Sequence, residues 1–227
     1  MNKISIILLV MTLLFSTSIS AQAVYIGNTQ GGTDFPQGAF SFADAVIDYS
    51  PGIVGGNPSV PHSGAINALG VPDFSGDIPC TTPETCTFVS LGDGGSITLQ
   101  FLDNKLTGSG TTDQDLWIFE VGIDTEDTYV DISKDGVSWS SVGKVAGSTA
   151  GIDIDFYGFG IIDIFEFIRL TDDTLLDGQT GITVGADIDA VGAITTVLTP
   201  VPEPSTFLLL GGGLAGLGFY ARRRRKE

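Results

Sequence analysis

The sequence predicts an all-β protein whose body, residues 24–199, is a single jelly-roll-type β-sandwich. Three observations predict this fold. Short apolar segments alternate with Gly, Asp, Asn, Ser and Pro, and no apolar pattern of helical period runs beyond a turn or two. The 31 glycines of the 227-residue chain favour short strands joined by turns. The body is also long enough to bury the core of one domain.

Eight segments of the body have the composition of strands. From Ser96 to Phe101 apolar and polar residues alternate, as in a strand with one buried face. The run from Leu116 to Phe119 is apolar on both faces, which is typical of a central strand covered on each side. The predicted strands are Ala43–Tyr49, Thr87–Leu91, Ser96–Phe101, Asp115–Val121, Thr128–Ser133, Val137–Val142, Phe165–Leu170 and Ala186–Ile194.

One hairpin is marked by its turn residues. Asp135-Gly136 lies between two predicted strands, and Asp-Gly predicts a tight turn with positive φ at both central residues. The surrounding sequence, a strand followed by Ser133-Lys134-Asp135-Gly136-Val137-Ser138-Trp139, resembles the hairpin of discoidin-like, galactose-binding-type β-sandwiches. The resemblance covers about a dozen residues and implies the jelly-roll fold, but it carries no ligand over to this chain.

Residues 1–23 have the form of a secretory signal peptide. Lys3 precedes a mostly apolar stretch from Ile4 to Phe15, and Ala21-Gln22-Ala23 provides an A-x-A cleavage site. We expect cleavage after Ala23. A retained membrane anchor is the alternative.

Residues 200–227 have the order of a sorting tail. The motif Pro202-Glu203-Pro204 is followed by a 16-residue apolar stretch from Thr206 to Ala221, which is shorter than the roughly 20 residues that span a bilayer. A basic cluster then ends the chain, and it would hold the extreme C-terminus in the cytoplasm. We therefore expect a short transmembrane anchor helix. The basic residues are Arg222, Arg223, Arg224, Arg225 and Lys226.

This order resembles the PEP-CTERM sorting signal of Gram-negative bacteria. The resemblance implies that an exosortase-type enzyme recognises the motif, removes the tail and releases or transfers the protein outward. It implies export through the inner membrane, a cell-surface or extracellular location, and an association with extracellular polysaccharide and biofilm. A plain C-terminal membrane anchor is the alternative.

The body is more acidic than the whole chain. The formal net charge is −17, but between Val24 and Glu203 only Lys105, Lys134, Lys144 and Arg169 face 26 acids, which gives 4 − 26 = −22. Such a surface repels phosphate backbones, so nucleic-acid binding is disfavoured. It should attract cations instead.

The two cysteines are close in sequence. Cys80 and Cys86 are separated by five residues, and in an oxidising exported compartment this spacing predicts a disulfide that pins a surface loop. A metal site is the alternative, but its only possible histidine is His62, which is expected to be an ordinary loop residue.

Calcium is the metal that the acidic residues suggest, because it takes six to eight oxygen ligands. Asp187 and Asp189 would share one strand face by their period-two spacing, and Asp113 and Asp115 precede the central strand. The sandwiches that the body resembles commonly carry a structural calcium, so the resemblance adds to the prediction. A solvated acidic face is the alternative. Weaker candidates are Asp124, Glu126 and Asp127.

Catalysis has little support in the sequence, which has no G-x-S-x-G elbow and no cysteine outside the predicted disulfide. Trp117 is expected in the core, and Trp139 and loop aromatics such as Phe35, Phe74 and Tyr157 are possible contacts for sugar rings. We therefore expect a non-catalytic surface or matrix protein that binds polysaccharide or another surface component. A secreted glycan-active hydrolase that uses paired carboxylates is the alternative.

Overall fold

The computed structural model describes residues 22–26, 32–53, 57–74, 80–121, 126–146, 149–174, 181–195, 197 and 211–213. The chain divides into two compact units, Ala21–Thr199 and Met1–Ser20 with Pro200–Glu227. In the second unit, residues 211–213 are helical and exposed. Across the described residues, no helix is long and apolar enough to cross a membrane. The predicted sorting motif, basic cluster and first 21 residues of the leader lie outside the described residues.

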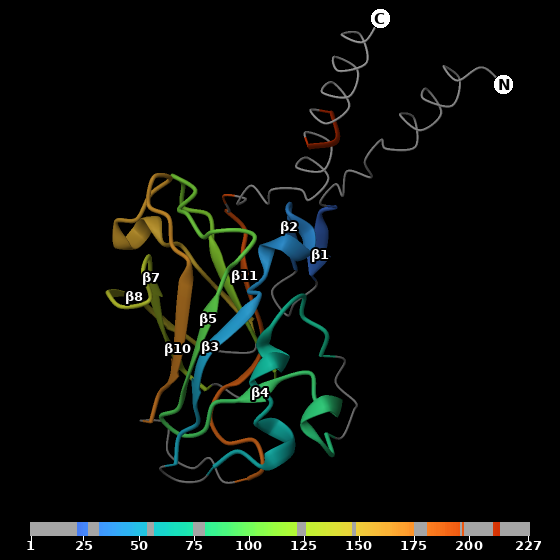
Figure 1. The fold of residues 1–227 in the computed structure, drawn as a ribbon. Helices are drawn as coiled ribbons and strands as arrows, with labels where there is room; N and C mark the ends of the chain where they lie inside the picture. Colours follow the sequence, from blue (N-terminus) through green and yellow to red (C-terminus); the bar gives the residue numbers. More distant parts are fainter. Residues whose placement is uncertain are drawn as a thin grey trace, which may run out of the picture. The chain divides into compact units, whose positions relative to one another are not determined.

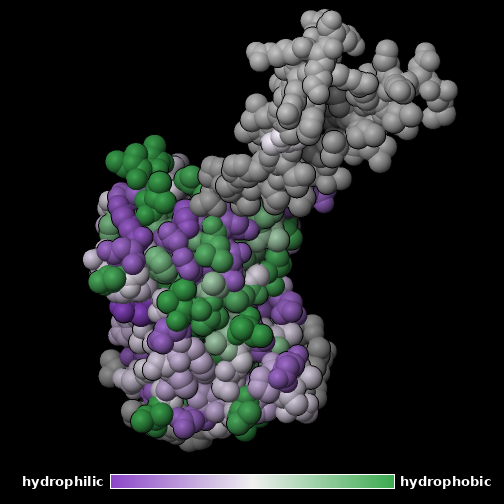
Figure 2. Space-filling view, in the orientation of Figure 1, coloured by the Kyte–Doolittle hydropathy of each residue, from purple (hydrophilic) through white to green (hydrophobic). Residues whose placement is uncertain are grey.

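The larger of two main sheets has five strands in the order β3-β5-β10-β7-β8, and all neighbouring strands are antiparallel (Figure 1). In β10 every second residue is buried, so one face of this strand points into the molecule. The side of the sandwich drawn in Figure 2 carries hydrophilic residues interspersed with hydrophobic ones. The strands are β3 (Ala45–Ser50), β5 (Ser96–Gln100), β7 (Thr128–Ser133), β8 (Trp139–Val145) and β10 (Phe167–Asp172).

The smaller main sheet has four antiparallel strands in the order β4-β11-β6-β9. Two further short strands near the start of the chain form a separate antiparallel pair. The strands of these two sheets are β4 (Val89–Ser90), β6 (Leu116–Glu120), β9 (Thr149–Ile152), β11 (Asp187–Ala193), β1 (Val24–Ile26) and β2 (Thr33–Phe35).

The two main sheets pack face to face and enclose the main core. Leu99 and Ile168 of the larger sheet lie in one buried cluster with Ile118 and Val191 of the smaller sheet. In Figure 1, β11 runs behind the strands of the larger sheet, as the second layer of a sandwich. The predicted single jelly-roll-type β-sandwich is therefore confirmed.

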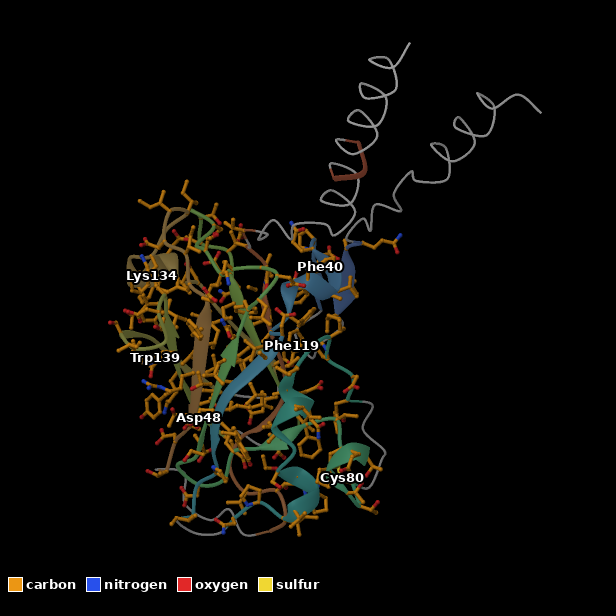
Figure 3. All side chains as sticks on the ribbon, viewed as in Figure 1. Phe40, Asp48, Cys80, Phe119, Lys134 and Trp139 are labelled. Carbon is orange, nitrogen blue, oxygen red and sulfur yellow. A yellow bond between two sulfur atoms is a disulfide. The ribbon has the colours of Figure 1, made fainter. Side chains whose placement is uncertain are left out.

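Strand β6 is buried along its whole length because both of its faces are covered. Ile118 faces the main core, whereas Trp117 and Phe119 lie in a second cluster with Phe35 and Phe42. The ring centroids of Phe35 and Phe42 are 4.7 Å apart. Figure 3 shows Phe119 inside the molecule. The expectations of a doubly covered central strand and of a core Trp117 are confirmed.

Each of the eight predicted strands overlaps a strand of the structure, with the predicted bounds at β7 and with ends that differ by at most three residues in the others. Three strands were not predicted: β1, β2 and β9. They have only three or four residues each, too few for an alternating pattern to show in the sequence. Phe35, expected in a loop, is fully buried in β2.

Cys80 and Cys86 are joined by a disulfide around η4 (Pro83–Thr85). Figure 3 shows Cys80 beside this short helix. The loop also has its own hydrogen bonds, because Thr85 Oγ1 accepts the backbone N–H of Thr82 while the Thr85 N–H bonds to Thr82 O. The disulfide thus closes a segment that is already ordered locally.

The β7–β8 hairpin has a longer turn than its Asp-Gly pair predicts. Ser133 pairs with Trp139, so five residues form the connection, and only Gly136 has positive φ, at 72°. Asp135 turns the chain with its side chain instead: Oδ1 accepts the N–H groups of Val137 at 2.8 Å and Ser138 at 2.7 Å. The prediction of a tight turn with positive φ at both Asp135 and Gly136 is wrong, because the Asp135 carboxylate accepts the turn N–H groups in place of the backbone.

Replacing Asp135 with alanine is expected to lower the melting temperature by roughly 2–5 °C, because two turn N–H groups lose their acceptor. Hydrogen bonds from these N–H groups lower the pKa of Asp135 from 3.8 to about 2. The charge-dependent part of its stabilisation is therefore complete above about pH 4 and is lost as the pH falls through about 2. Asp135→Asn, which keeps an acceptor oxygen, is the control. Thermal melts of the three proteins from pH 6 to pH 2 test this, and equal stability of wild type and Asp135→Ala at pH 6 would contradict it.

Candidate functional site

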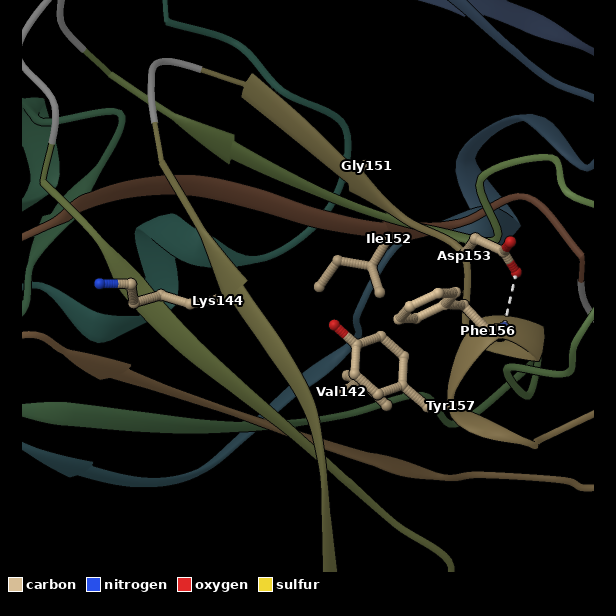
Figure 4. Close-up of a pocket in the computed structure, with 7 residues that line it drawn as sticks. All are labelled: Val142, Lys144, Gly151, Ile152, Asp153, Phe156 and Tyr157. Atoms are coloured by element: carbon tan, nitrogen blue, oxygen red, sulfur yellow. Dashed lines mark hydrogen bonds between the residues drawn. The ribbon is translucent and has the colours of Figure 1, made fainter.

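An open pocket of about 320 Å³ lies where the edge strands of the two sheets, β8 and β9, approach each other (Figure 4). The residues that follow β9 complete it, including the short helix η5 (Asp155–Tyr157). Seven residues line the pocket: Val142, Lys144, Gly151, Ile152, Asp153, Phe156 and Tyr157. Each of the two main sheets therefore contributes residues to the pocket, the larger through β8 and the smaller through β9.

A bulge in β8 makes room for Tyr157. The register between β7 and β8 shifts between Tyr129 and Asp131, so that β8 has one extra residue there. Gly143 lies in this bulge with a φ of 96°, and a Cβ on it would overlap the Tyr157 hydroxyl. Tyr157 can lie against β8 only because residue 143 is glycine.

Phe156 and Tyr157 give the pocket an exposed aromatic surface. Phe156 is 80% exposed and Tyr157 41%. Their ring centroids are 5.2 Å apart and the planes are nearly perpendicular, at 82°. Asp153 Oδ1 accepts the Phe156 N–H at 3.3 Å and so orders the start of η5 (Figure 4). Two large rings held in the open by a short ordered helix are a surface suited to binding another molecule.

Lys144 lines the same pocket, and acidic neighbours hold its ammonium group on the side away from Phe156 and Tyr157 (Figure 4). Its Nζ forms ion pairs with Asp127 and, at 2.9 Å, with Asp173. The hydrogen bonds that Lys144 donates to these two carboxylates raise its pKa, so the side chain stays charged. The aliphatic part of Lys144 contributes to the pocket lining, as Figure 4 shows.

Three carboxylates gather beside the pocket. Asp115, Asp153 and Asp155 each offer an oxygen, and these oxygens lie within 4.8 Å of one another. Asp115 is fully buried and accepts the Ile154 N–H at 3.0 Å. Its burial raises its pKa, while its hydrogen bonds act in the opposite direction. Oxygen donors at this spacing suit a hard cation such as calcium, so these residues fit the predicted ion by chemistry and distance.

Asp113, the second predicted ligand near the central strand, is not part of this group. It is exposed, and its Oδ2 accepts the Thr111 hydroxyl at 2.8 Å. Asp153 and Asp155 were not predicted as ligands, because nearly forty residues separate them from Asp115 and only the pairing of β9 with β6 brings them together.

Asp187 and Asp189 lie at the other end of the β6–β11 pair from Asp115. The Asp187 carbonyl accepts the Val121 N–H, whereas the Asp115 carbonyl accepts the Ile194 N–H. Burial raises the pKa of Asp187 to about 7, and its Oδ1 accepts the Ser90 hydroxyl. Burial also raises the pKa of Asp189 to about 6. The four predicted calcium ligands therefore do not form one site.

Asp189 is the extra residue of a bulge in β11, because the register shifts between Ile188 and Ala190. Side chains do not alternate strictly between the two faces of the sheet across a bulge, so the spacing of Asp187 and Asp189 does not show which face Asp189 occupies. Its two oxygens accept the backbone N–H groups of Asp73 at 3.2 Å and Phe74 at 3.3 Å.

His62 is buried rather than an exposed loop residue. Its ring stacks on Phe88 with the centroids 5.3 Å apart, and Nδ1 lies 2.7 Å from Ser59 Oγ. Burial lowers its pKa, so neutral imidazole is favoured. The ring also lies within reach of Cys80 and Cys86, but both sulfurs belong to the disulfide and are not thiolate ligands.

The other predicted sugar contacts differ in exposure. Trp139 lies at the outer side of the larger sheet (Figure 3), where the Arg169 guanidinium lies 4.4 Å from its ring centroid. Phe74 is half-exposed and packs edge-on against Phe88. Only Tyr157 of these residues lines the pocket, and Phe156 was missed although it is the adjacent aromatic.

Residues 200–225 match the family described as the PEP-CTERM protein-sorting motif. The chain carries a PEP-CTERM sorting motif. The PEP-CTERM match covers Pro202, Glu203, Pro204 and the arginine cluster, and it indicates an exported protein that an exosortase processes. Export across the inner membrane of a Gram-negative bacterium follows from the same motif. It says nothing of what the β-sandwich binds.

The solved structures that are similar to this chain include the following two. One, CpGH89CBM32-6 produced by Clostridium perfringens, is 12% identical over 47% of this chain and 72% of its own, with a TM-score of 0.31. The C-terminal domain of a chitobiase from Bacteroides fragilis is 11% identical over 77% of this chain and 99% of its own, with a TM-score of 0.35. Among curated proteins none matches the sequence. At these TM-scores neither similarity bears on function, and the fold rests on the strands described above.

Replacing Gly143 with alanine is expected to destabilise the protein by about 1–3 kcal/mol, because the new Cβ meets Tyr157 at a backbone conformation that favours glycine. Gly181→Ala is the matched control, since a Cβ at Gly181 has no atom within 4 Å. Urea denaturation measures both variants. Adding Tyr157→Phe to Gly143→Ala should restore part of the loss, and equal stability of the two single variants would show that Tyr157 does not need the bulge.

Proposed function

We propose that the exported PEP-CTERM protein is a non-catalytic component of the cell surface or extracellular matrix, whose β-sandwich binds polysaccharide in the β8–β9 pocket. The observation that carries this proposal is the exposed pair of rings, Phe156 and Tyr157, next to the carboxylate of Asp153 and the aliphatic part of Lys144. Exposed apolar groups that lie side by side often mark a binding surface.

The pocket has the two kinds of group that a sugar needs. The C–H faces of a pyranose ring are apolar and stack on aromatic rings, which supplies most of the apolar contact. Sugar hydroxyls form hydrogen bonds with charged and polar groups at the rim. Asp153 accepts only the Phe156 N–H through Oδ1 in the described structure, so its carboxylate has acceptor capacity left for a hydroxyl.

The charge of the body narrows the kind of polysaccharide. With four basic residues against 26 acids between Val24 and Glu203, the protein repels polyanions at low ionic strength. Lys144 is the one basic residue of the pocket lining and is already paired with two aspartates. Neutral chains are therefore better ligands than uronic-acid polymers in the absence of a bridging cation.

A glycan-active hydrolase is the second candidate, and one observation favours it. Asp153 and Asp155 offer carboxylate oxygens within 4.8 Å of each other beside an aromatic pocket, and paired carboxylates perform glycoside hydrolysis. Asp115, the third member, is fully buried and cannot reach a substrate. Turnover of a bound glycan would select this candidate over the first.

Truncating either ring is expected to weaken glycan binding. We expect Phe156→Ala and Tyr157→Ala each to lower the affinity for a neutral polysaccharide at least about fivefold, corresponding to about 1 kcal/mol of stacking. A glycan array identifies the ligand, and affinity electrophoresis with that glycan measures the variants. Tyr25→Ala removes a tyrosine that is 60% exposed on β1, outside the pocket, and should leave binding unchanged.

Two results would contradict the proposal. Unchanged binding by both ring variants would place the sugar site elsewhere on the sandwich. Release of shorter products from the bound glycan, abolished by Asp153→Asn, would show an enzyme rather than a binding protein.

The structural calcium remains a prediction, and its place would be the group of Asp115, Asp153 and Asp155. If it binds there, a chelator should lower the melting temperature, because an ion that binds only the folded state stabilises it. Asp155→Asn should reduce that dependence by the part that this group supplies, whereas Asp113→Asn, which alters an exposed aspartate outside the group, should keep it whole. A melting temperature that chelator leaves unchanged in the wild type would rule out structural calcium at this position.

A further inference from the structure

A second group of acids gathers at the opposite end of β6. It contains residues from both main sheets and from the segments next to them. Strand pairing places Thr128 opposite Asp172 in the larger sheet, and Glu120 opposite Ile188, next to Asp187, in the smaller. The acids of this group are Glu120, Glu126, Asp127, Asp172, Asp173 and Asp187.

Glu120 is the buried centre of this group. It is 6% exposed, and its Oε2 has no hydrogen-bond partner in the described part of the chain. Burial, and then the charges of the surrounding carboxylates, raise its pKa to about 9. Thr128 is fully buried, and its Oγ1 also has no partner among the described residues. Two unsatisfied oxygens at one end of a core are costly unless something binds them.

Asp172 joins the two sheets at this place. Its Oδ1 accepts the N–H of Ala186, the residue before Asp187, at 2.8 Å, and its Oδ2 accepts the Gly94 N–H at 3.0 Å. The carboxylate of the larger sheet therefore lies next to the start of β11 in the smaller sheet. The Asp172 charge raises the pKa of both Asp187, after burial, and Glu120.

The protein supplies too little positive charge here. Lys144 pairs with Asp127 and Asp173, whereas no ion pair within the described ranges involves Glu120, Asp172 or Asp187. A buried carboxylate without a cation must either take a proton or bind an ion. All of the unsatisfied or unpaired groups are oxygens, which are the ligands of hard divalent cations.

We propose that a divalent cation of the calcium type binds between the two sheets at Glu120. Glu120 Oε2 and the Thr128 hydroxyl oxygen are its inner ligands, and Asp172 and Asp187 complete its shell. No three carboxylates of this group have oxygens within 4.8 Å of one another, so the ion reaches the outer ones in part through water, as calcium commonly does. None of these four residues lines the proposed glycan pocket or belongs to the Asp115 group.

The test is a calcium titration of the full chain by isothermal titration calorimetry, with thermal melts of the same samples. We expect Glu120→Gln, which keeps the size and removes the charge, to weaken one class of calcium site at least about tenfold. The same variant should lose most of the calcium-dependent rise in melting temperature. Asp187→Asn should weaken the same site. It changes a half-buried residue, so it replaces Glu120→Gln in the test if that variant does not fold.

Two controls separate this site from its alternatives. Asp48→Asn removes an exposed acid of β3 outside the group and should bind calcium as the wild type does. Asp155→Asn tests the Asp115 group and should leave the Glu120-dependent binding in place. Wild-type calcium affinity in both Glu120→Gln and Asp187→Asn would overturn the proposal and leave Glu120 as a protonated core residue. Calcium binding lost only in Asp155→Asn would overturn it equally.

Discussion

The antiparallel pairing of β6 with β11 is the constraint on which the rest of the structure depends. Both strands lie in the middle of the smaller sheet, and β6 is covered on one face by the main core and on the other by an aromatic cluster. Because the strands run in opposite directions, the start of β6 meets the end of β11. Asp115 therefore lies at one end of the pair, and Glu120 and Asp187 lie at the other. The β6–β11 pairing therefore keeps the Asp115 group apart from the acids around Glu120.

The sequence predicts most of this architecture because burial determines it. The apolar run from Leu116 to Phe119 requires cover on both faces, and the alternation in β5 requires one buried face. What covers the second face of β6 was not predictable. Phe35 and Phe42 come from a short strand and from the end of a 3-10 helix, η1 (Gly38–Ser41), neither of which has a periodic pattern. The two rings can cover this face of β6 because Gly192 of β11 has no side chain and leaves room for both of them.

The site was harder to predict than the fold because it depends on backbone irregularities. Tyr157 lines the pocket through a bulge at Gly143, and Asp189 leaves the predicted face through a bulge in β11. A bulge inserts one residue without changing composition, so spacing in the sequence does not show it. The group of Asp115, Asp153 and Asp155 could not be predicted from sequence spacing either. Asp115 and Asp155 become neighbours only because the short β9, which was not predicted, pairs with β6.

The excess of acidic over basic residues in the body bears on what the exported protein can bind. All four basic residues of the body form ion pairs: Lys105, Lys134, Lys144 and Arg169. They contact Glu166, Asp163, Asp127, Asp173 and Asp131, so basic residues of the body pair with only a minority of its 26 acids, and its net charge stays strongly negative. Outside the cell, divalent cations are one source of balancing positive charge. Under the proposed function, the protein contacts extracellular polysaccharide either through apolar stacking, which needs no charge, or through a cation shared with an acidic chain. The exposed rings of Phe156 and Tyr157 favour the first way.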